Sequence, residues 1–474
     1  MDFVPTPSKE TLRILLACWA GVFLVLTWMQ WRSKRASGVP LAYAFNLSLL
    51  HVPGALCYCM GYYAPRSPIL VLNGASLTNT FVGFYVALIG FASLVVGVMA
   101  CSIFLPVSER NAQPPKRLYP AISSQFPGTV LLFALVSFLV LGRTVGRIPS
   151  LGSLTGSGTA LSIVAVFLFC YMAYRKGDRV GFWKWVIATS GFPFVTVALM
   201  GFANSGTQAA MTVWMFVYRF FKPRLLALLG FVCLLYGSMT FYVNYMRERD
   251  SIRAAVWGQG GIGLRLEKMR DMAVNFEFFN PYNQGHLEKM DARLNQNGLV
   301  GIAVQDLAAG RIGFGEGGTL YAAAVAWVPR IIWPNKPSTG GSGSVVSRYT
   351  GLTFAESTSV GVGQVLELYI NWGITSVVFG FILYGFVMRY LDERAGVGLE
   401  HQDYWQFCRW ILPSFGMLQS GGSFSEVIGT TAANVVFVTI AHHFVFAKYY
   451  EDNDRPVRRD ENRVALPREY RGSK

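Results

Sequence analysis

The chain has 474 residues, of which 53% are hydrophobic and only 14% are charged, and its formal net charge is +15. Soluble domains carry about 25% charged residues, so this chain has too few to cover a surface exposed to water. Runs such as LLACWAGVFLVLTWMQW (15–31) approach the roughly 20 apolar residues that cross a hydrocarbon core, where a helix satisfies its own backbone. The sequence therefore predicts an all-α, polytopic integral membrane protein.

The apolar runs predict about eleven membrane-spanning helices in two groups. An amino-terminal bundle occupies residues 1–244, and three further spans follow in 364–447. A long polar segment, 245–363, separates the groups, and a basic tail, 448–474, ends the chain. The predicted spans lie near residues 13–31, 40–61, 80–105, 128–146, 158–174, 183–202, 206–221, 225–244, 364–388, 405–421 and 428–447.

Basic residues gather at alternate junctions between these spans. Examples are RSKR (32–35), RKGDR (175–179), KPR (222–224) and the tail. The positive-inside rule then places the amino terminus in the periplasm and the carboxyl terminus in the cytoplasm. The long segment 245–363 consequently lies on the outer face, and membrane topology explains the positive charge without a nucleic-acid partner.

The long segment contains two stretches of distinct character. SIRAAVWGQGGIGLRLEKMRDMAVNFEFF (251–279) has helical spacing, whereas GGTLYAAAVAWVPRIIWP (317–334) is apolar but too short to cross a membrane twice. We expect the second stretch to form a re-entrant or interfacial helix. The Gly/Ser-rich run that follows, 338–352, is expected to be a flexible linker that could act as a lid.

Cations on the outer side are candidates for binding a phosphate group at the membrane surface. Arg330, Trp333 and Lys336 share the stretch PRIIWPNKP, whose prolines restrict the backbone. Arg143 and Arg147 are four residues apart and share one face of a helix. Arginine binds phosphate through a planar fork and lysine binds it as a point charge. The alternative for each is an interfacial anchor, in which Trp and snorkelling cations hold a helix end at the lipid surface.

Two acids and one histidine are candidates for acid–base chemistry. Glu367 opens a predicted span in GQVLELYINWG, with Asn371 one turn further on. A carboxylate that enters a membrane is costly and indicates a functional site. Glu426 in SGGSFSEVIGT is the second candidate acid, and His286 is either a general base or a plain surface histidine. No Walker, H-E-x-x-H or dinucleotide motif occurs, so we expect neither a metal nor a cofactor.

The stretches PRIIWPNKP and GQVLELYINWG, in this order around a Gly/Ser-rich run, resemble the carboxyl-terminal half of Wzy-type O-antigen polymerases, also called oligosaccharide repeat unit polymerases. The resemblance is close over residues 329–394, and elsewhere it extends to span count and the position of the long segment. The matching residues are Pro329, Arg330, Trp333, Pro334, Lys336 and Pro337 in the first motif and Glu367, Tyr369, Asn371 and Gly373 in the second.

The resemblance implies a GT-C-like or Wzy-like fold and a metal-independent membrane glycosyltransferase. Such an enzyme joins glycan repeat units carried on undecaprenyl pyrophosphate at the outer face of the bacterial inner membrane. The implied partners are this lipid-linked glycan, the bilayer, and a chain-length regulator and flippase of the same pathway. An O-antigen ligase, a transporter of lipid-linked glycans and a non-catalytic scaffold remain as alternatives.

In the mechanism that follows, four cations would hold the pyrophosphate: Arg143, Arg147, Arg330 and Lys336. They would stabilise the leaving group as its negative charge develops, so Arg330 counts as catalytic as well as binding. Glu367 would deprotonate the acceptor hydroxyl.

Overall fold

The computed structural model describes residues 6–33, 35–105, 125–144, 153–201, 203–221, 224–258, 261–337, 341–354 and 360–446. Within these residues the regular secondary structure is helical and no strand occurs. The helices are α1 (Lys9–Arg32), α2 (Val39–Cys59), α3 (Pro68–Leu72), α4 (Leu77–Phe104), α6 (Phe126–Thr144), α7 (Ser153–Lys176), α8 (Arg179–Thr189), α9 (Phe192–Met200), α10 (Ala203–Phe220), α11 (Arg224–Trp257), α12 (Ile262–Val274), α13 (Gln284–Arg293), α14 (Asn297–Ala308), α15 (Gly318–Ala324), α16 (Ser342–Thr350), α17 (Gln364–Glu400), α18 (Tyr404–Met417), α19 (Phe424–Ala441) and the short π-helix η2 (His442–Phe446).

Seven of these helices are long and apolar enough to cross a membrane, namely α1, α2, α4, α7, α11, α17 and α19. Several of their large apolar side chains, such as Leu24, Phe379 and Leu383, are exposed in the isolated chain. In a bilayer, such side chains contact lipid instead of water. The prediction of an all-helical membrane protein is therefore confirmed for the part of the chain that the structure describes. The seven helices correspond to the predicted spans at 13–31, 40–61, 80–105, 158–174, 225–244, 364–388 and 428–447.

The other four predicted spans are shorter or interrupted. Helix α6 has 19 residues, of which those with described side chains give an apolar stretch over Phe126–Val140, and α10 is not among the seven. The run 183–202 is divided into α8 and α9 at Ser190 and Gly191, just before Pro193. Helix α18, in place of the span 405–421, has 14 residues and is about 21 Å long, which is less than the roughly 30 Å of a hydrocarbon core. The described residues therefore contain seven helices that are long and apolar enough to cross a membrane, four fewer than the predicted spans.

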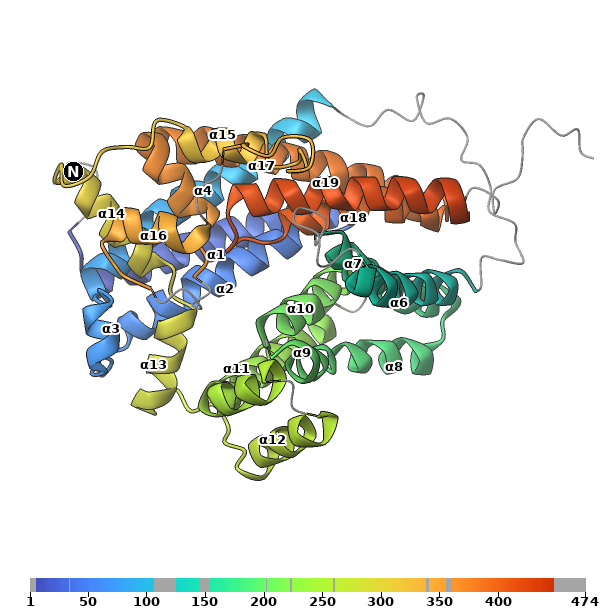
Figure 1. The fold of residues 1–474 in the computed structure, drawn as a ribbon, viewed down its shortest axis with the longest axis horizontal. Coiled ribbons are helices and arrows are strands. Elements are labelled where there is room, and N and C mark those ends of the chain that lie inside the picture. Colours follow the sequence, from blue (N-terminus) through green and yellow to red (C-terminus); the bar gives the residue numbers. More distant parts are fainter. Residues whose placement is uncertain are drawn as a thin grey trace, which may run out of the picture.

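Helices α4 and α17 pack closely through glycines. A Cβ atom added at Gly97 would lie 2.0 Å from the carbonyl oxygen of Ile382, and one added at Gly385 would lie 2.1 Å from that of Leu94. Small residues let two helix backbones approach in a membrane, where van der Waals packing replaces the hydrophobic drive. This contact makes α4 and α17 the central pair of the bundle. Figure 1 shows the neighbouring α18 and α19 running side by side, with α6, α7 and α8 grouped at one end of the view.

The last part of α17 is fixed to the start of α2 by a buried carboxylate. Asp392 is fully buried, and its Oδ1 accepts hydrogen bonds from the backbone N–H groups of Ser37 (2.8 Å), Gly38 (2.7 Å) and Val39 (3.0 Å). Arg389 donates to Oδ2 of the same carboxylate at 3.0 Å. These bonds satisfy N–H groups that a helix start otherwise leaves without partners. Asp392 thereby joins two segments that are distant in sequence.

The polar segment 245–363 is largely helical, and the expected division at residue 244 falls inside α11, which continues to Trp257. Helix α14 packs against α4, with Val300 and Val304 buried. At its start, the Oδ1 of Asn297 lies 2.6 Å from Nδ1 of His51 in α2. The segment is therefore a layer of helices anchored on the membrane-spanning bundle.

The Gly/Ser-rich run 338–352 contains α16, so the expectation of a flexible linker was wrong for the described part of it. Val345, Val346 and Tyr349 of this helix are buried. These side chains lie on one helical face, and their burial outweighs the low helix propensity of the surrounding Gly and Ser residues. The basic tail 448–474 lies outside the described residues.

Candidate functional site

Glu367 lies in the first turn of α17 and is held at the start of α19. The side chain is 1% exposed, and its Oε2 accepts a hydrogen bond from the backbone N–H of Phe424 at 2.7 Å. The other oxygen, Oε1, is buried and has no hydrogen-bond partner among the described residues. A helix amino terminus favours a negative charge beside it. One oxygen of Glu367 is thus fixed, and the other is left to interact with a ligand.

Asn371 lies one turn along from Glu367, as the sequence indicated. Its Nδ2 donates to the hydroxyl oxygen of Thr319 at 2.8 Å and to the carbonyl oxygen of Glu367 at 2.6 Å. Because the carbonyl oxygen of Glu367 can only accept, this contact requires the Nδ2 donor, and Oδ1 points elsewhere. Asn371 is fully buried, and Oδ1 also lacks a partner in the described structure.

Helix α17 is interrupted directly after Asn371. Trp372 and Gly373 have non-helical backbone angles, with φ of +64° at Gly373, a conformation that glycine adopts without strain. The interruption separates a short first part, 364–371, from the long second part that begins at residue 374. Glu367 and Asn371 therefore lie on the short part, at one end of a discontinuous helix.

Glu426, the second candidate acid, lies in the first turn of α19, the helix whose start also binds the Glu367 side chain. Glu426 caps this helix start. Its Oε2 accepts from the backbone N–H of Ser423 at 3.2 Å, and the Ser423 side chain accepts from the backbone N–H of Glu426. Its Oε1 accepts from the hydroxyl of Ser342 in α16 at 2.8 Å. Both oxygens are engaged, so this geometry gives Glu426 a positioning role and leaves Glu367 as the acid with an unpaired oxygen.

The stretch around Arg330 forms turns after the short helix α15, so the helix expected over 317–334 is confined to its beginning. Ile331 and Ile332 are 70% and 74% exposed, and Trp333 is 37% exposed. Arg330 is exposed among them and donates to the carbonyl oxygen of Pro334 at 3.4 Å. Exposed apolar and aromatic side chains around a cation suit the headgroup layer of a membrane.

Lys336 is engaged within its own loop. Its ammonium group donates to the carbonyl oxygens of Ala326 (2.8 Å) and Val328 (2.6 Å). Burial, and then the charge of Arg330, lower the pKa of Lys336 below its ordinary value. The geometry therefore favours a role for Lys336 in shaping the loop. Of the other expected phosphate ligands, Arg143 is in α6 with its side chain outside the described atoms, and Arg147 lies outside the described residues.

His286 is buried in α13, and both of its ring nitrogens have partners. Nδ1 accepts from the backbone N–H of Asn280 at 3.1 Å, and Nε2 lies 3.2 Å from Oε2 of Glu277. This hydrogen bond is the largest cause of the lowered pKa of Glu277. Helix α13 packs against α2 and α11, whereas the neighbours of Glu367 come from α15 and α19. The structure thus separates His286 from the Glu367 site.

A cluster of three arginines was not anticipated from the sequence. Arg253 on α11 and Arg293 on α13 both lie within electrostatic reach of Arg249 on α11. Arg249 forms an ion pair with Asp250 at 3.6 Å, and Arg293 is exposed with no hydrogen bond or ion pair among the described residues. The sequence signal was the four-residue spacing in RERDSIR, which places Arg249 and Arg253 on one helical face.

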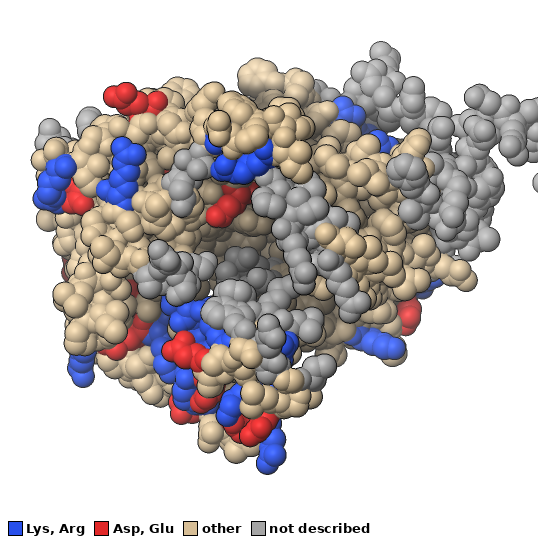
Figure 2. Space-filling view, in the orientation of Figure 1, with Lys and Arg blue, Asp and Glu red and all other residues tan. Residues whose placement is uncertain are grey.

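Figure 2 shows the surface over α11 and α13, the helices that carry these arginines. The face in view is hollowed near its centre, Lys and Arg side chains gather below the hollow over α11 and α13, and acidic atoms lie at its upper rim near the start of α19. Acidic atoms lie among these cations, and Arg249 is paired with Asp250. The cluster places three positive side chains on two neighbouring helices, which makes it a candidate anion site.

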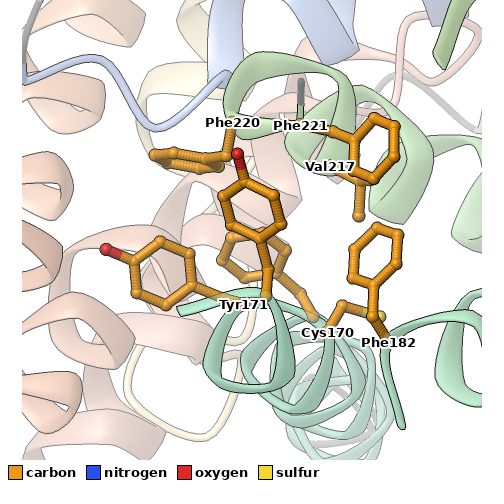
Figure 3. A pocket seen from close by; sticks show the side chains of 8 residues that line it. Cys170, Tyr171, Phe182, Val217, Phe220 and Phe221 are labelled. Atoms are coloured by element: carbon orange, nitrogen blue, oxygen red, sulfur yellow. The ribbon is translucent and has the colours of Figure 1, made fainter. Parts of the chain in front are cut away.

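An apolar cavity elsewhere does not suit a ligand. Aromatic rings from α7, α8 and α10, among them Tyr171, Phe182 and Phe220, surround a space of about 10 Å³ (Figure 3). This volume has room for about one water molecule, and the lining offers almost no polar atoms to hold it. The cavity is a packing gap between helices.

Residues 60–447 match the model of a family described as "Domain of unknown function (DUF8712)". The match covers most of the chain, so the chain belongs to this family. The matched region contains Glu367, Asn371, Arg330 and the arginine cluster. Comparison with curated proteins and with solved structures found no match.

Proposed function

We propose that this member of the DUF8712 family polymerises glycan repeat units carried on undecaprenyl pyrophosphate, at the outer face of a bacterial inner membrane, with its amino terminus in the periplasm and its carboxyl terminus in the cytoplasm. The observation that carries the proposal is Glu367, a motif residue of the resembling polymerases, buried with one oxygen fixed by Phe424 and the other unpaired. The product is a polysaccharide such as an O-antigen, a capsule or an exopolysaccharide.

In the proposed reaction, a hydroxyl oxygen of one repeat unit attacks the anomeric carbon of another. The bond between that carbon and the pyrophosphate oxygen breaks, and the hydroxyl proton moves to Oε1 of Glu367. A positioned base of this kind contributes a factor of roughly 10²–10⁴ to a rate. No metal is required if cations neutralise the leaving pyrophosphate.

The cations of the site are proposed from two groups. Arg330 remains a candidate because it is exposed beside apolar side chains suited to the lipid surface. Arg249, Arg253 and Arg293 join it, since they are clustered on α11 and α13. Guanidinium groups bind phosphate in a planar, two-pronged manner. Lys336 contributes by fixing the loop that carries Arg330.

A second candidate function, transport of the lipid-linked glycan, is favoured by one observation. Helix α17 is discontinuous and carries buried polar side chains at the interruption, an arrangement that transporters use to form binding sites within a membrane. A ligase that moves finished polymer to an acceptor shares the same donor chemistry.

The test is the lipid-linked glycan profile of cells that lack the gene, complemented with the wild-type chain, Glu367→Gln, or the control Glu267→Gln on exposed α12. The proposal expects single repeat units to accumulate outside the membrane with no polymer ladder, and Glu367→Gln to behave as the deletion. Full-length polymer retained on the lipid carrier would indicate a ligase. Repeat units trapped inside the cell would indicate a transporter.

A further inference from the structure

A glycine-rich loop, residues 313–317, lies across the interruption of α17. The backbone N–H of Gly315 donates to the carbonyl oxygen of Ile370 at 2.8 Å. Glu316 has a φ of +47°, which is uncommon and strained for a residue with a side chain. The loop is thus held in a specific, locally unfavourable backbone conformation on top of the short first part of α17.

Two aromatic rings fasten the loop on either side of this hydrogen bond. A Cβ atom added at Gly317 would lie 2.6 Å from the indole ring of Trp372, so that ring rests directly on the loop backbone. In the opposite direction, the ring of Phe314 lies 3.8 Å from the Cβ position of Gly373. Trp372 and Phe314 are 52% and 47% exposed, so both contacts can separate without opening the core.

Polar atoms lie directly beneath the loop. A Cβ atom added at Gly315 would lie 2.6 Å from the hydroxyl oxygen of Tyr349 and 3.4 Å from Oδ1 of Asn371. Tyr349 is 2% exposed and Asn371 is fully buried. Thr319 bonds to Asn371 and lies beside Glu367, which is on the same face of the helix. Oδ1 of Asn371, which has no partner among the described residues, therefore lies beside a tyrosine hydroxyl, and Glu367, whose Oε1 is likewise without a partner there, lies one turn away next to Thr319.

Burying a polar atom without a partner costs about 1–3 kcal/mol, and a charged one costs more. A fold can retain such atoms where a ligand supplies the missing bonds. We propose that the loop 313–317 is a lid over a subsite for the hydroxyl groups of a saccharide. Sugar hydroxyls donate to Glu367 and Asn371, and the Tyr349 hydroxyl donates to a sugar oxygen. This inference rests on the proposed function, because it places the acceptor end of the growing glycan at Glu367.

The lid is tested by hydrogen exchange, measured by mass spectrometry on the purified full chain, for the peptide that contains residues 313–317. Gly315→Ala brings a methyl group against the Tyr349 oxygen, and Tyr349→Phe removes that oxygen. Gly313→Ala is the matched control, since a Cβ atom at Gly313 meets nothing within 4 Å. We expect faster exchange in Gly315→Ala, exchange close to wild type in Gly313→Ala, and recovery of slow exchange in the double variant Gly315→Ala/Tyr349→Phe.

Two results would overturn the lid. One is unchanged exchange in Gly315→Ala, and the other is fast exchange that Tyr349→Phe fails to reverse, because the loop would then not rest on Tyr349.

The subsite is tested separately, by the turnover of lipid-linked repeat units extracted from the deletion strain. Losing one neutral hydrogen bond of about 1 kcal/mol gives Tyr349→Phe roughly a fivefold higher KM with little change in kcat. An unchanged KM would overturn the subsite.

The two proposals fail separately. Exchange of the loop is read without turnover, so a negative result there leaves the polymerase proposal in place. A deletion strain with an unaltered glycan profile would instead overturn the function and the saccharide assignment together, while the exchange data would still decide whether the loop moves.

Discussion

The carboxylate of Glu367 and the backbone of Phe424 join the first turns of two helices, with Oε2 accepting the N–H of Phe424 at 2.7 Å. This bond fixes the side chain, since a helix start provides N–H donors that no carbonyl within the helix can satisfy. Because Oε2 is engaged in this bond and Oε1 has no hydrogen-bond partner among the described residues, Oε1 is the oxygen that can accept a proton or bind a ligand.

Glu367→Gln keeps the shape of the side chain and removes its ability to take a proton. We expect polymer formation to fall at least about 100-fold, the lower end of the usual contribution of a general base. The measurement is the length distribution of lipid-linked glycan in complemented cells, with membrane protein levels checked by immunoblot. Normal ladders from Glu367→Gln would remove the residue from the mechanism.

The arginine cluster predicts a binding defect. In Arg249→Gln/Arg253→Gln, the loss of charge-assisted contacts of about 1.5–3 kcal/mol each should raise KM for the lipid-linked donor by at least tenfold. The salt dependence of KM should also weaken, since fewer charges take part. The control is Arg270→Gln on exposed α12. If the double variant and the control have equal KM values, the anion site lies elsewhere.

Lys336 predicts a change in loop order. Lys336→Met removes the donor to the carbonyl oxygens of Ala326 and Val328, so the exposed Trp327 and Trp333 should become sensitive to brief digestion with chymotrypsin. Arg330→Ala keeps both hydrogen bonds of Lys336 and should therefore leave the digestion pattern unchanged. Equal resistance of wild type and Lys336→Met would show that the lysine does not hold the loop.

Asp291 predicts a pH-dependent stability. Burial raises the pKa of Asp291 above its usual value of 3.8, against the opposing hydrogen bonds from Tyr63, Asn295 and Tyr58. In the window above pH 3.8, up to the raised pKa, the folded state holds more protons than the unfolded state. The free energy of unfolding therefore falls as pH rises through this window, and the contribution of the protonated form is complete only below it.

Asparagine does not titrate, so Asp291→Asn should lose the pH-dependent contribution of residue 291 to the free energy of unfolding. Its thermal unfolding midpoint should therefore decline less with rising pH than that of wild type. The matched control is Asp271→Asn, whose side chain is 45% exposed on α12. Parallel pH profiles of wild type and Asp291→Asn would contradict the assignment.

Apolar runs of about 20 residues were sufficient to predict the seven long apolar helices. A run of this length fits the hydrocarbon core, and there the backbone N–H and C=O groups can be hydrogen-bonded within the segment only if it is a helix. The division of 183–202 was less apparent, although Gly191 and Pro193 are the residues at which a helix ends and the next begins. The helix α16 was missed because its surroundings are rich in Gly and Ser. The burial of Val345 and Val346, which stabilises the helix, depends on tertiary packing that the sequence does not show.

The site was predictable where its residues are close in sequence. The four-residue spacing of Glu367 and Asn371 placed both on one helical face, and the structure confirms that placement. The partners of Lys336 and His286 could not be read from sequence, since they are backbone groups and side chains positioned by turns. Arg293 joins Arg249 only through the packing of α13 on α11, which local spacing does not encode.

The clamp at Asp392 and the interruption at Gly373 divide α17 into parts with different freedom. The end that carries Asp392 is tied to the start of α2 by three hydrogen bonds from backbone N–H groups to the Asp392 carboxylate, and Gly385 packs against α4. The residues before the interruption are joined to the rest of the helix through the non-helical pair Trp372 and Gly373, and the Ser376 hydroxyl donates to the carbonyl oxygen of Leu368 across it. Under the proposed function, we expect the short first part of α17 to rearrange around a glycan while the second part keeps its contacts with α2 and α4.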